Sequence, residues 1–175
     1  MQRKTYKEHY LAYFERSDVD ALIDESIDLV ADSERIFFVG NGGSNSISSH
    51  MMEDFGKMLK KQTFSFSDAS LITCYANDYG YENAFAEWIK IYKPSKSDLL
   101  VAISSSGNSK SILNAVAVCN NNDCPVLTLS GFSKDNALRK MGRVNLHIES
   151  NSYGIVETLH QLFIHTLLDE CNERN

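Results

Sequence analysis

The stretch Val101-Ala102-Ile103-Ser104-Ser105-Ser106-Gly107-Asn108-Ser109 is the most informative part of this sequence for the fold. It is an apolar run, typical of a buried strand, that ends in four serine hydroxyls around one glycine, just before a helical pattern. Serine hydroxyls and the free N–H groups of a helix N-terminus both donate to anions, and the helix dipole adds partial positive charge there. The stretch therefore predicts a strand, a phosphate-binding turn and a helix, with no lysine required.

A second stretch has the same organisation. The apolar run Arg35-Ile36-Phe37-Phe38-Val39 ends in Gly40-Asn41-Gly42-Gly43-Ser44-Asn45-Ser46. Either stretch alone could be an ordinary polar loop, because glycine and serine are common loop residues. Two of them in one chain favour a single anionic ligand. Nicotinamide and ATP binding are disfavoured, because Asn45 replaces the third glycine of G-x-G-x-x-G and no Gly-Lys-Ser/Thr follows.

Apolar runs and helical periodicity alternate along the whole chain. The pattern predicts helices at about 6–16 and 20–32, and then strands at about 35–39, 63–66, 98–103, 125–129 and 143–148 with helices between most of them. Such alternation favours an α/β fold with a doubly wound, parallel five-stranded sheet flanked by helices, preceded by N-terminal helices. Ligands of such sheets bind beyond the carboxyl ends of the strands, where Ser44 and the 104–109 serines would lie.

Composition narrows the class of protein. The chain has 175 residues and 43% hydrophobic content, which suits one globular domain over residues 1–175. A net charge of −6 argues against nucleic-acid binding. The N-terminal residues lack the apolar core of a signal peptide and no run is long enough to cross a membrane, so we expect a cytoplasmic protein without membrane contact. The four cysteines form no C-x-x-C pair and are expected to be reduced and mostly buried.

Several blocks, taken in order and spacing, resemble the sugar isomerase (SIS) domain family, and within it the bacterial phosphoheptose isomerases. These blocks are Gly40-Asn41-Gly42-Gly43-Ser44, His50, Ser67-Asp68, Asn77-Asp78-Tyr79-Gly80, Ser104 to Ser109 and Ile164-His165. The resemblance runs from about residue 31 to residue 170. It implies conversion of the ketose phosphate sedoheptulose 7-phosphate to an aldose phosphate in heptose biosynthesis, by a homotetramer with active sites at subunit contacts.

The resemblance also implies roles for residues that hold the substrate. The aromatic helix face of Tyr6, Tyr10, Tyr13 and Phe14, within the N-terminal helices of residues 1–33, would contact another subunit. Asp78 would bind sugar hydroxyls, although Asn77-Asp78-Tyr79-Gly80 would also make a good turn without any functional role. The phosphate would be bound by Ser44, Ser104, Ser105, Ser106 and Ser109.

An isomerase needs a base beside the carbonyl and an acid for its oxygen, and carboxylates and histidines commonly serve. His50 and Asp54 lie four residues apart in a helical pattern whose apolar stripe includes Ile47 and Met51, so both project from one side of that helix. By resemblance His50 is a metal ligand. Asp54 takes the place of a glutamate that is both metal ligand and catalytic base, with one methylene fewer, and the neighbouring Glu53 is a competing candidate for the base.

Near the end of the chain, Glu157, Gln161 and His165 form a polar stripe at four-residue steps in an otherwise apolar helix. By resemblance His165 is a metal ligand and a catalytic acid or base, and Glu157 replaces a ligating glutamine. The set of His50, Asp54, Glu157 and His165 suits zinc, with other divalent ions possible. Eight residues on one straight helix span about 12 Å, so a shared ion requires long reach, a helix end or two subunits.

The family resemblance leaves the substrate and the activity open. Gly154 stands where the family carries an aspartate, and together with Asp54 and Glu157 it puts the exact substrate in doubt. Alternatives are an isomerase of another sugar phosphate, or a noncatalytic SIS module that senses a phosphosugar or docks to a partner protein, since one fold serves several functions.

Overall fold

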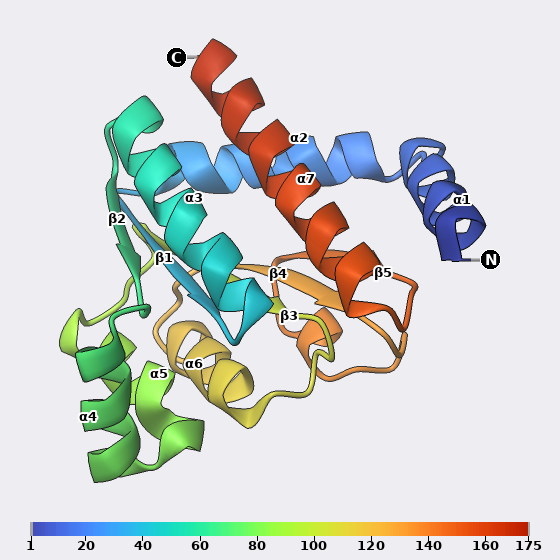
Figure 1. The fold of residues 1–175 in the computed structure, drawn as a ribbon. Coiled ribbons are helices and arrows are strands. Elements are labelled where there is room, and N and C mark those ends of the chain that lie inside the picture. Colours follow the sequence, from blue (N-terminus) through green and yellow to red (C-terminus); the bar gives the residue numbers. More distant parts are fainter. Residues whose placement is uncertain (1, 175) are drawn as a thin grey trace.

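The protein is described by a computed structural model of residues 2–174, whose centre is a parallel sheet (Figure 1). The strand order is β2-β1-β3-β4-β5, and each neighbouring pair is parallel. The predicted five-stranded, doubly wound sheet is confirmed. The strands are β1 (Arg35–Gly40), β2 (Gln62–Ser65), β3 (Asp98–Ser104), β4 (Val126–Gly131) and β5 (Val144–Ile148).

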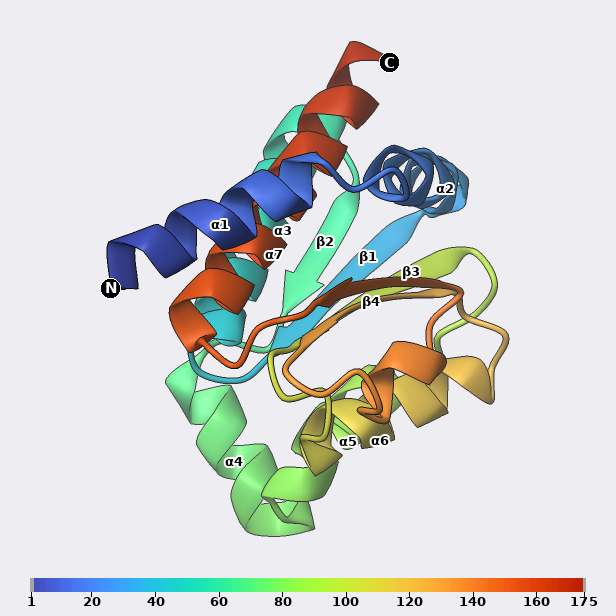
Figure 2. The ribbon, with the colours of Figure 1, turned by 90° about the vertical axis from the view of Figure 1, so that its right-hand side faces the viewer.

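Helices cover both faces of the sheet (Figure 2). Along β3, Leu99, Val101 and Ile103 belong to one hydrophobic core and Leu100 and Ala102 to the other, which is why this run is apolar throughout. The first core also holds the apolar faces of α2 (Val19–Asp32), α3 (Gly43–Leu59) and α7 (Tyr153–Glu173), and the second those of α5 (Tyr81–Ile91) and α6 (Lys110–Asn120).

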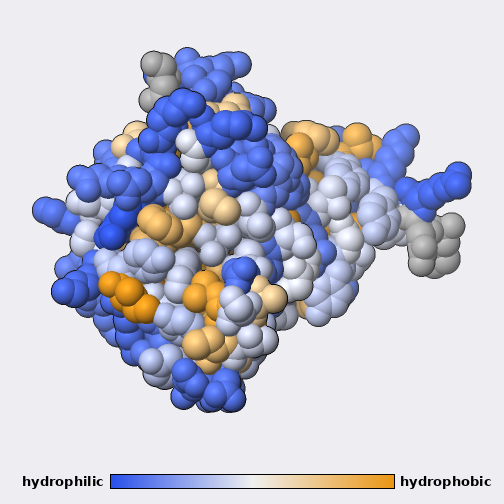
Figure 3. Space-filling model, turned by 60° about the vertical axis from the view of Figure 1, so that its left-hand side comes forward, coloured by the Kyte–Doolittle hydropathy of each residue, from blue (hydrophilic) through white to orange (hydrophobic). Residues whose placement is uncertain are grey.

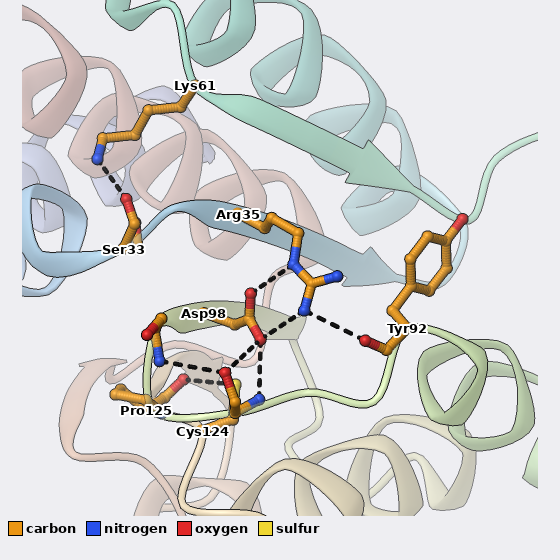
Figure 4. A network of polar contacts seen from close by, with 9 residues as sticks. Ser33, Arg35, Lys61, Tyr92, Asp98, Cys124 and Pro125 are labelled. Atoms are coloured by element: carbon orange, nitrogen blue, oxygen red, sulfur yellow. Dashed lines mark hydrogen bonds and ion pairs between the residues drawn. The ribbon is translucent and has the colours of Figure 1, made fainter.

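An ion pair fixes the amino ends of the two central strands (Figure 4). Arg35 and Asp98 are register partners in β1 and β3. The guanidinium donates to both carboxylate oxygens at 2.7 and 2.9 Å, and to the carbonyl oxygen of Tyr92 at 3.2 Å. Burial raises the pKa of Asp98, but the bonds from Arg35 and from the Ser95 N–H outweigh it and lower the pKa. The carboxylate stays charged and holds the strands in register.

The segment 77–80 differs from the expected turn. Asn77, Asp78 and Tyr79 form the last turn of helix α4 (Ala69–Tyr79), and only Gly80 lies outside a helix. Asp68 caps the start of α4 by accepting from the N–H groups of residues 70 and 71. The helix ends at Gly80, whose N–H donates to the Ala76 carbonyl oxygen and whose φ of 77° suits glycine, and α5 follows. The turn interpretation of Asp78 is therefore wrong.

Two helices begin the described chain, as predicted: α1 (Gln2–Phe14) and α2. Of the aromatic face of α1, Tyr13 is buried in the first core, whereas Tyr6 and Phe14 are exposed. Exposed Tyr79, Tyr81 and Ile91 lie in α4 and α5. Figure 3 shows that the side of the molecule it presents is largely hydrophilic, with several small hydrophobic patches.

Two compositional predictions can be compared with the structure. Cys119, Cys124 and Cys171 are buried and Cys74 is exposed, so most of the cysteines are buried, as expected. Among residues 2–174, no helix is both long and apolar enough to cross a membrane.

Candidate active site

A cavity of about 260 Å³ lies where β1 and β3 end and α3 and α6 begin. The predicted meeting of the two serine-rich stretches is thereby confirmed. The lining residues are Asn41, Gly42, Gly43, Ser44, Ile103, Ser104, Ser105, Ser106, Ser109, Tyr153 and Glu157. We refer to this space as the serine cavity.

The first wall is the loop from β1 into α3. Gly42, with φ of 57°, turns the chain into the helix, and Ser44 is buried in the first helical turn. A side chain at position 43 would bring its Cβ to 2.6 Å from Cδ of Glu157, so glycine leaves room for this carboxylate in its present position. No side chain of residues 2–174 caps the N-terminus of α3. Within the part of the chain that is described, the N–H groups of Ser44 and Asn45 donate to the carbonyl oxygens of Asn41 and Gly42, at 3.1 and 3.0 Å, which leaves the Gly43 N–H of this turn to donate to a ligand.

The second wall is the loop from β3 into α6. The Ser104 hydroxyl accepts from the Gly107 N–H at 3.2 Å and lies 3.4 Å from the Ser109 hydroxyl, which fixes the turn. The helix α6 also begins without a side-chain cap among the described residues. Ser105 is 5% exposed, and its hydroxyl has no hydrogen-bond partner within the part of the chain that is described. A buried hydroxyl without a partner is costly unless a ligand supplies one.

Two lining residues, Asn41 and Tyr153, were not among the predicted site residues. Asn41 donates to the Ser111 hydroxyl at 3.0 Å and accepts from the Tyr81 hydroxyl at 2.6 Å, which ties the cavity to α5 and α6. Tyr153 opens α7 one helical turn before Glu157. The place of Asn41 inside the glycine-rich loop could have predicted that it lines the site. Tyr153 reaches the cavity through tertiary packing, which the local sequence does not indicate.

Glu157 supplies a carboxylate to the serine cavity. Partial burial raises the pKa of this group above its ordinary value, because a charged carboxylate loses solvation there. The residue expected to join the metal ligands thus lies with the phosphate serines within one chain.

A second group, which we call the histidine cluster, consists of His50, Asp54, Gln161 and His165. Nε2 of His50 lies 3.1 Å from Oδ2 of Asp54, and the rings of His50 and His165 are 5.3 Å apart between centroids. The Gln161 amide nitrogen lies 2.8 Å from Nε2 of His165 and 3.5 Å from Nδ1 of His50. The predicted projection of His50 and Asp54 from one side of α3 is confirmed.

The histidine cluster has part of the chemistry of a metal site. Two imidazoles and one carboxylate are donors that zinc accepts. No group of three or more histidine, cysteine, aspartate or glutamate side chains within residues 2–174 is arranged to hold an ion as it stands. Glu157 lies eight residues before His165 on α7, about 12 Å along the helix axis. Within one chain, His50, Asp54 and His165 supply suitable donor types close to one another but not in metal-binding geometry, and Glu157 lies apart from them.

The remaining predicted site residues lie outside the serine cavity. Asp78 accepts from the Asn77 side chain at 2.9 Å on exposed α4. Asp54 is held by His50 and, at 3.3 Å, by Lys57. Glu53 and His50 border a separate, open hollow next to Ser67.

Comparison with protein families agrees with this arrangement. The family model described as the SIS domain matches residues 8–131. The chain belongs to the SIS domain family. Among SIS relatives, the phosphoheptose isomerase of Helicobacter pylori (strain Shi470) is 33% identical over 156 residues, which cover 85% of this chain and 79% of the relative. That of Fusobacterium nucleatum is 29% identical over 161 residues, covering 89% and 81%.

A solved SIS structure matches almost the whole chain. The phosphoheptose isomerase of Neisseria gonorrhoeae superposes with a TM-score of 0.81 and 23% identity, covering 97% of this chain and 96% of that one. This likeness supports the SIS fold over the full length of the chain, including the helices beyond residue 131.

Proposed function

We propose that this protein is a phosphoheptose isomerase, which converts sedoheptulose 7-phosphate to the corresponding aldose phosphate. The observation that carries the proposal is the serine cavity, where two uncapped helix N-termini and five serines face one space. Relatives of which this chain covers about four-fifths are named phosphoheptose isomerase. The chemistry of the cavity suits the phosphate end of such a substrate.

In this function the serines bind the phosphate. Ser104, Ser106 and Ser109 would donate from the α6 side, Ser44 from the α3 side, and Ser105 would gain the partner that it lacks. Asp78 is proposed to bind sugar hydroxyls.

Proton transfer would then proceed through an enediol. A base, Asp54 or Glu53, takes the proton from the carbon next to the ketone, and His165 protonates the oxygen. The amide nitrogen of Gln161, 2.8 Å from Nε2 of His165, orients that ring.

A divalent ion is part of the proposal. His50, Asp54 and His165 would hold zinc, and Glu157 would complete the set from a second subunit. A bound zinc ion polarises a carbonyl oxygen. This arrangement accords with a cytoplasmic homotetramer whose active sites lie at subunit contacts, the assembly that we propose for this chain.

The decisive experiment incubates the purified protein with ketose phosphates of five, six and seven carbons, with and without divalent metal, and resolves the products by mass spectrometry and NMR. We expect turnover of the seven-carbon substrate. Turnover of a shorter ketose phosphate only would identify an isomerase of another sugar, and no turnover of any would favour a noncatalytic module.

A matched pair of variants connects that activity to the serine cavity. Ser106 accepts from the N–H of Asn108, and Ser133 accepts from the N–H of Asp135 in the same i, i+2 manner but outside the serine cavity. Ser106→Ala should weaken phosphosugar binding by about 1–3 kcal/mol, the cost of a lost hydrogen bond to a charged group. Ser133→Ala should leave binding unchanged. Equal affinities in both variants would remove Ser106 from the site.

A further inference from the structure

A second cavity, of about 330 Å³, lies beside β5, the strand at one edge of the sheet. It shares no lining residue with the serine cavity among the residues described. Its walls come from α1, the short helix η1 (Leu138–Lys140), β5 and α7. They are His9, Ala12, Tyr13, Arg16, Arg139, His147, Ile148, Glu149 and Leu159. We refer to this space as the edge cavity.

His147 carries an unsatisfied polar atom at the edge cavity. The residue is 8% exposed, and its Nε2 has no hydrogen-bond partner within residues 2–174. Its other ring nitrogen, Nδ1, lies 3.2 Å from the Ser130 hydroxyl. Buried imidazole nitrogens are normally paired, so the free Nε2 indicates a place for a ligand atom.

The neighbours of Nδ1 determine which nitrogen carries the proton. The Asn136 amide donates to the Ser130 hydroxyl at 3.3 Å and lies 3.5 Å from Nδ1 of His147. The two N–H groups of Asn136 have closer acceptors in the carbonyl oxygens of Ser133, at 2.8 Å, and Gly131, at 3.1 Å, but this amide nitrogen is a donor only. A second N–H on Nδ1 would face that donor, so the Ser130 hydroxyl donates to Nδ1 instead. Nδ1 is then an acceptor, and the neutral ring carries its hydrogen on Nε2. Burial, with Arg139 nearby, lowers the pKa of His147 and keeps the ring neutral. The edge cavity therefore contains an N–H donor.

Two guanidinium groups line the same cavity. Arg16 is held in place by Asp18, at 2.7 and 2.9 Å, and by the carbonyl oxygen of His147, at 2.8 Å. Arg139 donates one bond, to the Lys134 carbonyl oxygen at 3.1 Å, which leaves further N–H groups of its guanidinium available. Guanidinium groups bind phosphate in a bidentate manner.

Glu149 sets the rest of the chemistry. Its exposed carboxylate lines the edge cavity, opposes a bare anion and accepts hydrogen bonds from hydroxyl groups. His9, the other imidazole there, has Nδ1 2.9 Å from the Thr5 carbonyl oxygen. The volume suits a small metabolite. We infer that the edge cavity binds a small hydroxylated phosphate ester, with Arg139 and Nε2 of His147 on the phosphate and Glu149 on a hydroxyl.

The test follows the ring nitrogens of His147 by ¹⁵N NMR in the full chain labelled at histidine. Without ligand, the ring should show the tautomer with hydrogen on Nε2. Addition of glycerol 3-phosphate should shift the Nε2 signal, and should do so equally in the Ser106→Ala variant, in which phosphate binding at the serine cavity is expected to be weaker. The readout is independent of turnover, so it separates this inference from the proposed isomerase activity.

Variants at the edge cavity complete the test. Arg139→Gln, at an exposed position, should weaken glycerol 3-phosphate binding by about 10- to 100-fold, as expected for a hydrogen bond to a charged group. Arg143→Gln changes an exposed arginine outside the cavity and should have no effect. Glu149→Gln should strengthen binding of inorganic phosphate and reduce the preference for the ester.

Three results would overturn the inference. They are a His147 signal that neither phosphate compound moves, unchanged ester binding in Arg139→Gln, and wild-type affinity for inorganic phosphate equal to that for the ester. The last would show a site for free phosphate without recognition of the hydroxyl groups.

Discussion

Replacing Ser105 with alanine should have opposite effects on stability and on binding. Its hydroxyl is buried and has no partner within the described chain. An unpaired buried hydroxyl costs about 1–3 kcal/mol. The substitution removes this cost and leaves a void of about one methyl group, worth about 1 kcal/mol. We therefore expect the free energy of unfolding of the ligand-free protein to stay level or to rise by up to about 2 kcal/mol.

The same substitution should weaken binding of a ketose phosphate. A hydroxyl that donates to a phosphate oxygen contributes about 1–3 kcal/mol, so affinity should fall by roughly 5- to 150-fold. Urea denaturation of the ligand-free protein gives the first quantity and calorimetric titration with the substrate gives the second.

Ser33→Ala is the matched control. Ser33 is also buried, but its hydroxyl donates to the Val30 carbonyl oxygen at 2.8 Å and lies outside the serine cavity. This variant should lose about 0.5–1.5 kcal/mol of stability and bind substrate normally. If Ser105→Ala is destabilised as much as Ser33→Ala and its affinity is unaltered, Ser105 is an ordinary core residue and the reasoning fails.

Three further predictions concern the histidines. Turnover in heavy water should place deuterium on the carbon beside the aldose carbonyl, and an unlabelled product would indicate a hydride shift. His165→Ala should lower kcat by about 10²- to 10⁴-fold, while calorimetry should show that substrate binding is retained. Zinc should raise the thermal unfolding midpoint more at pH 8 than at pH 6, because a ligating imidazole must be neutral. Both chelation and His50→Ala should abolish the rise. A midpoint that zinc does not change would contradict the proposed metal site. Burial lowers the pKa of His160 to about 4, so the unfolded chain takes up the proton first as pH falls. Urea titrations should therefore show about 3 kcal/mol of stability lost between roughly pH 6.5 and pH 4, and a smaller loss in His160→Gln; equal slopes would exclude this histidine as the cause.

The sheet and the serine cavity were predictable because their signals are local. An apolar run followed by serine and glycine specifies a strand end, and parallel strands place all such ends at one edge. Helical spacing likewise predicted that His50 and Asp54 lie on the same side of α3, and in the structure Nε2 of His50 is 3.1 Å from Oδ2 of Asp54.

Other features depend on tertiary packing and could not be predicted in this way. The four-residue spacing on α7 predicted the distance between Glu157 and His165. It did not predict that Glu157 would lie next to Gly43 in the serine cavity. Asn77 to Gly80 has the composition of a turn, yet α4 packs on α5 and the first three residues of this stretch belong to the helix. The edge cavity combines four elements, and His147 gave no local signal for it.

The two walls of the serine cavity are supported by different hydrophobic cores. The helix behind the first wall anchors Ile47, Met51 and Phe55 in one core, and the helix behind the second anchors Ile112 and Val116 in the other, across the sheet. Repacking either core should adjust the position of one wall by fractions of an ångström and leave the other in place. Substitutions in one core, whether engineered or evolved, can thus change substrate preference through one wall, while the serines of the other wall continue to bind the phosphate.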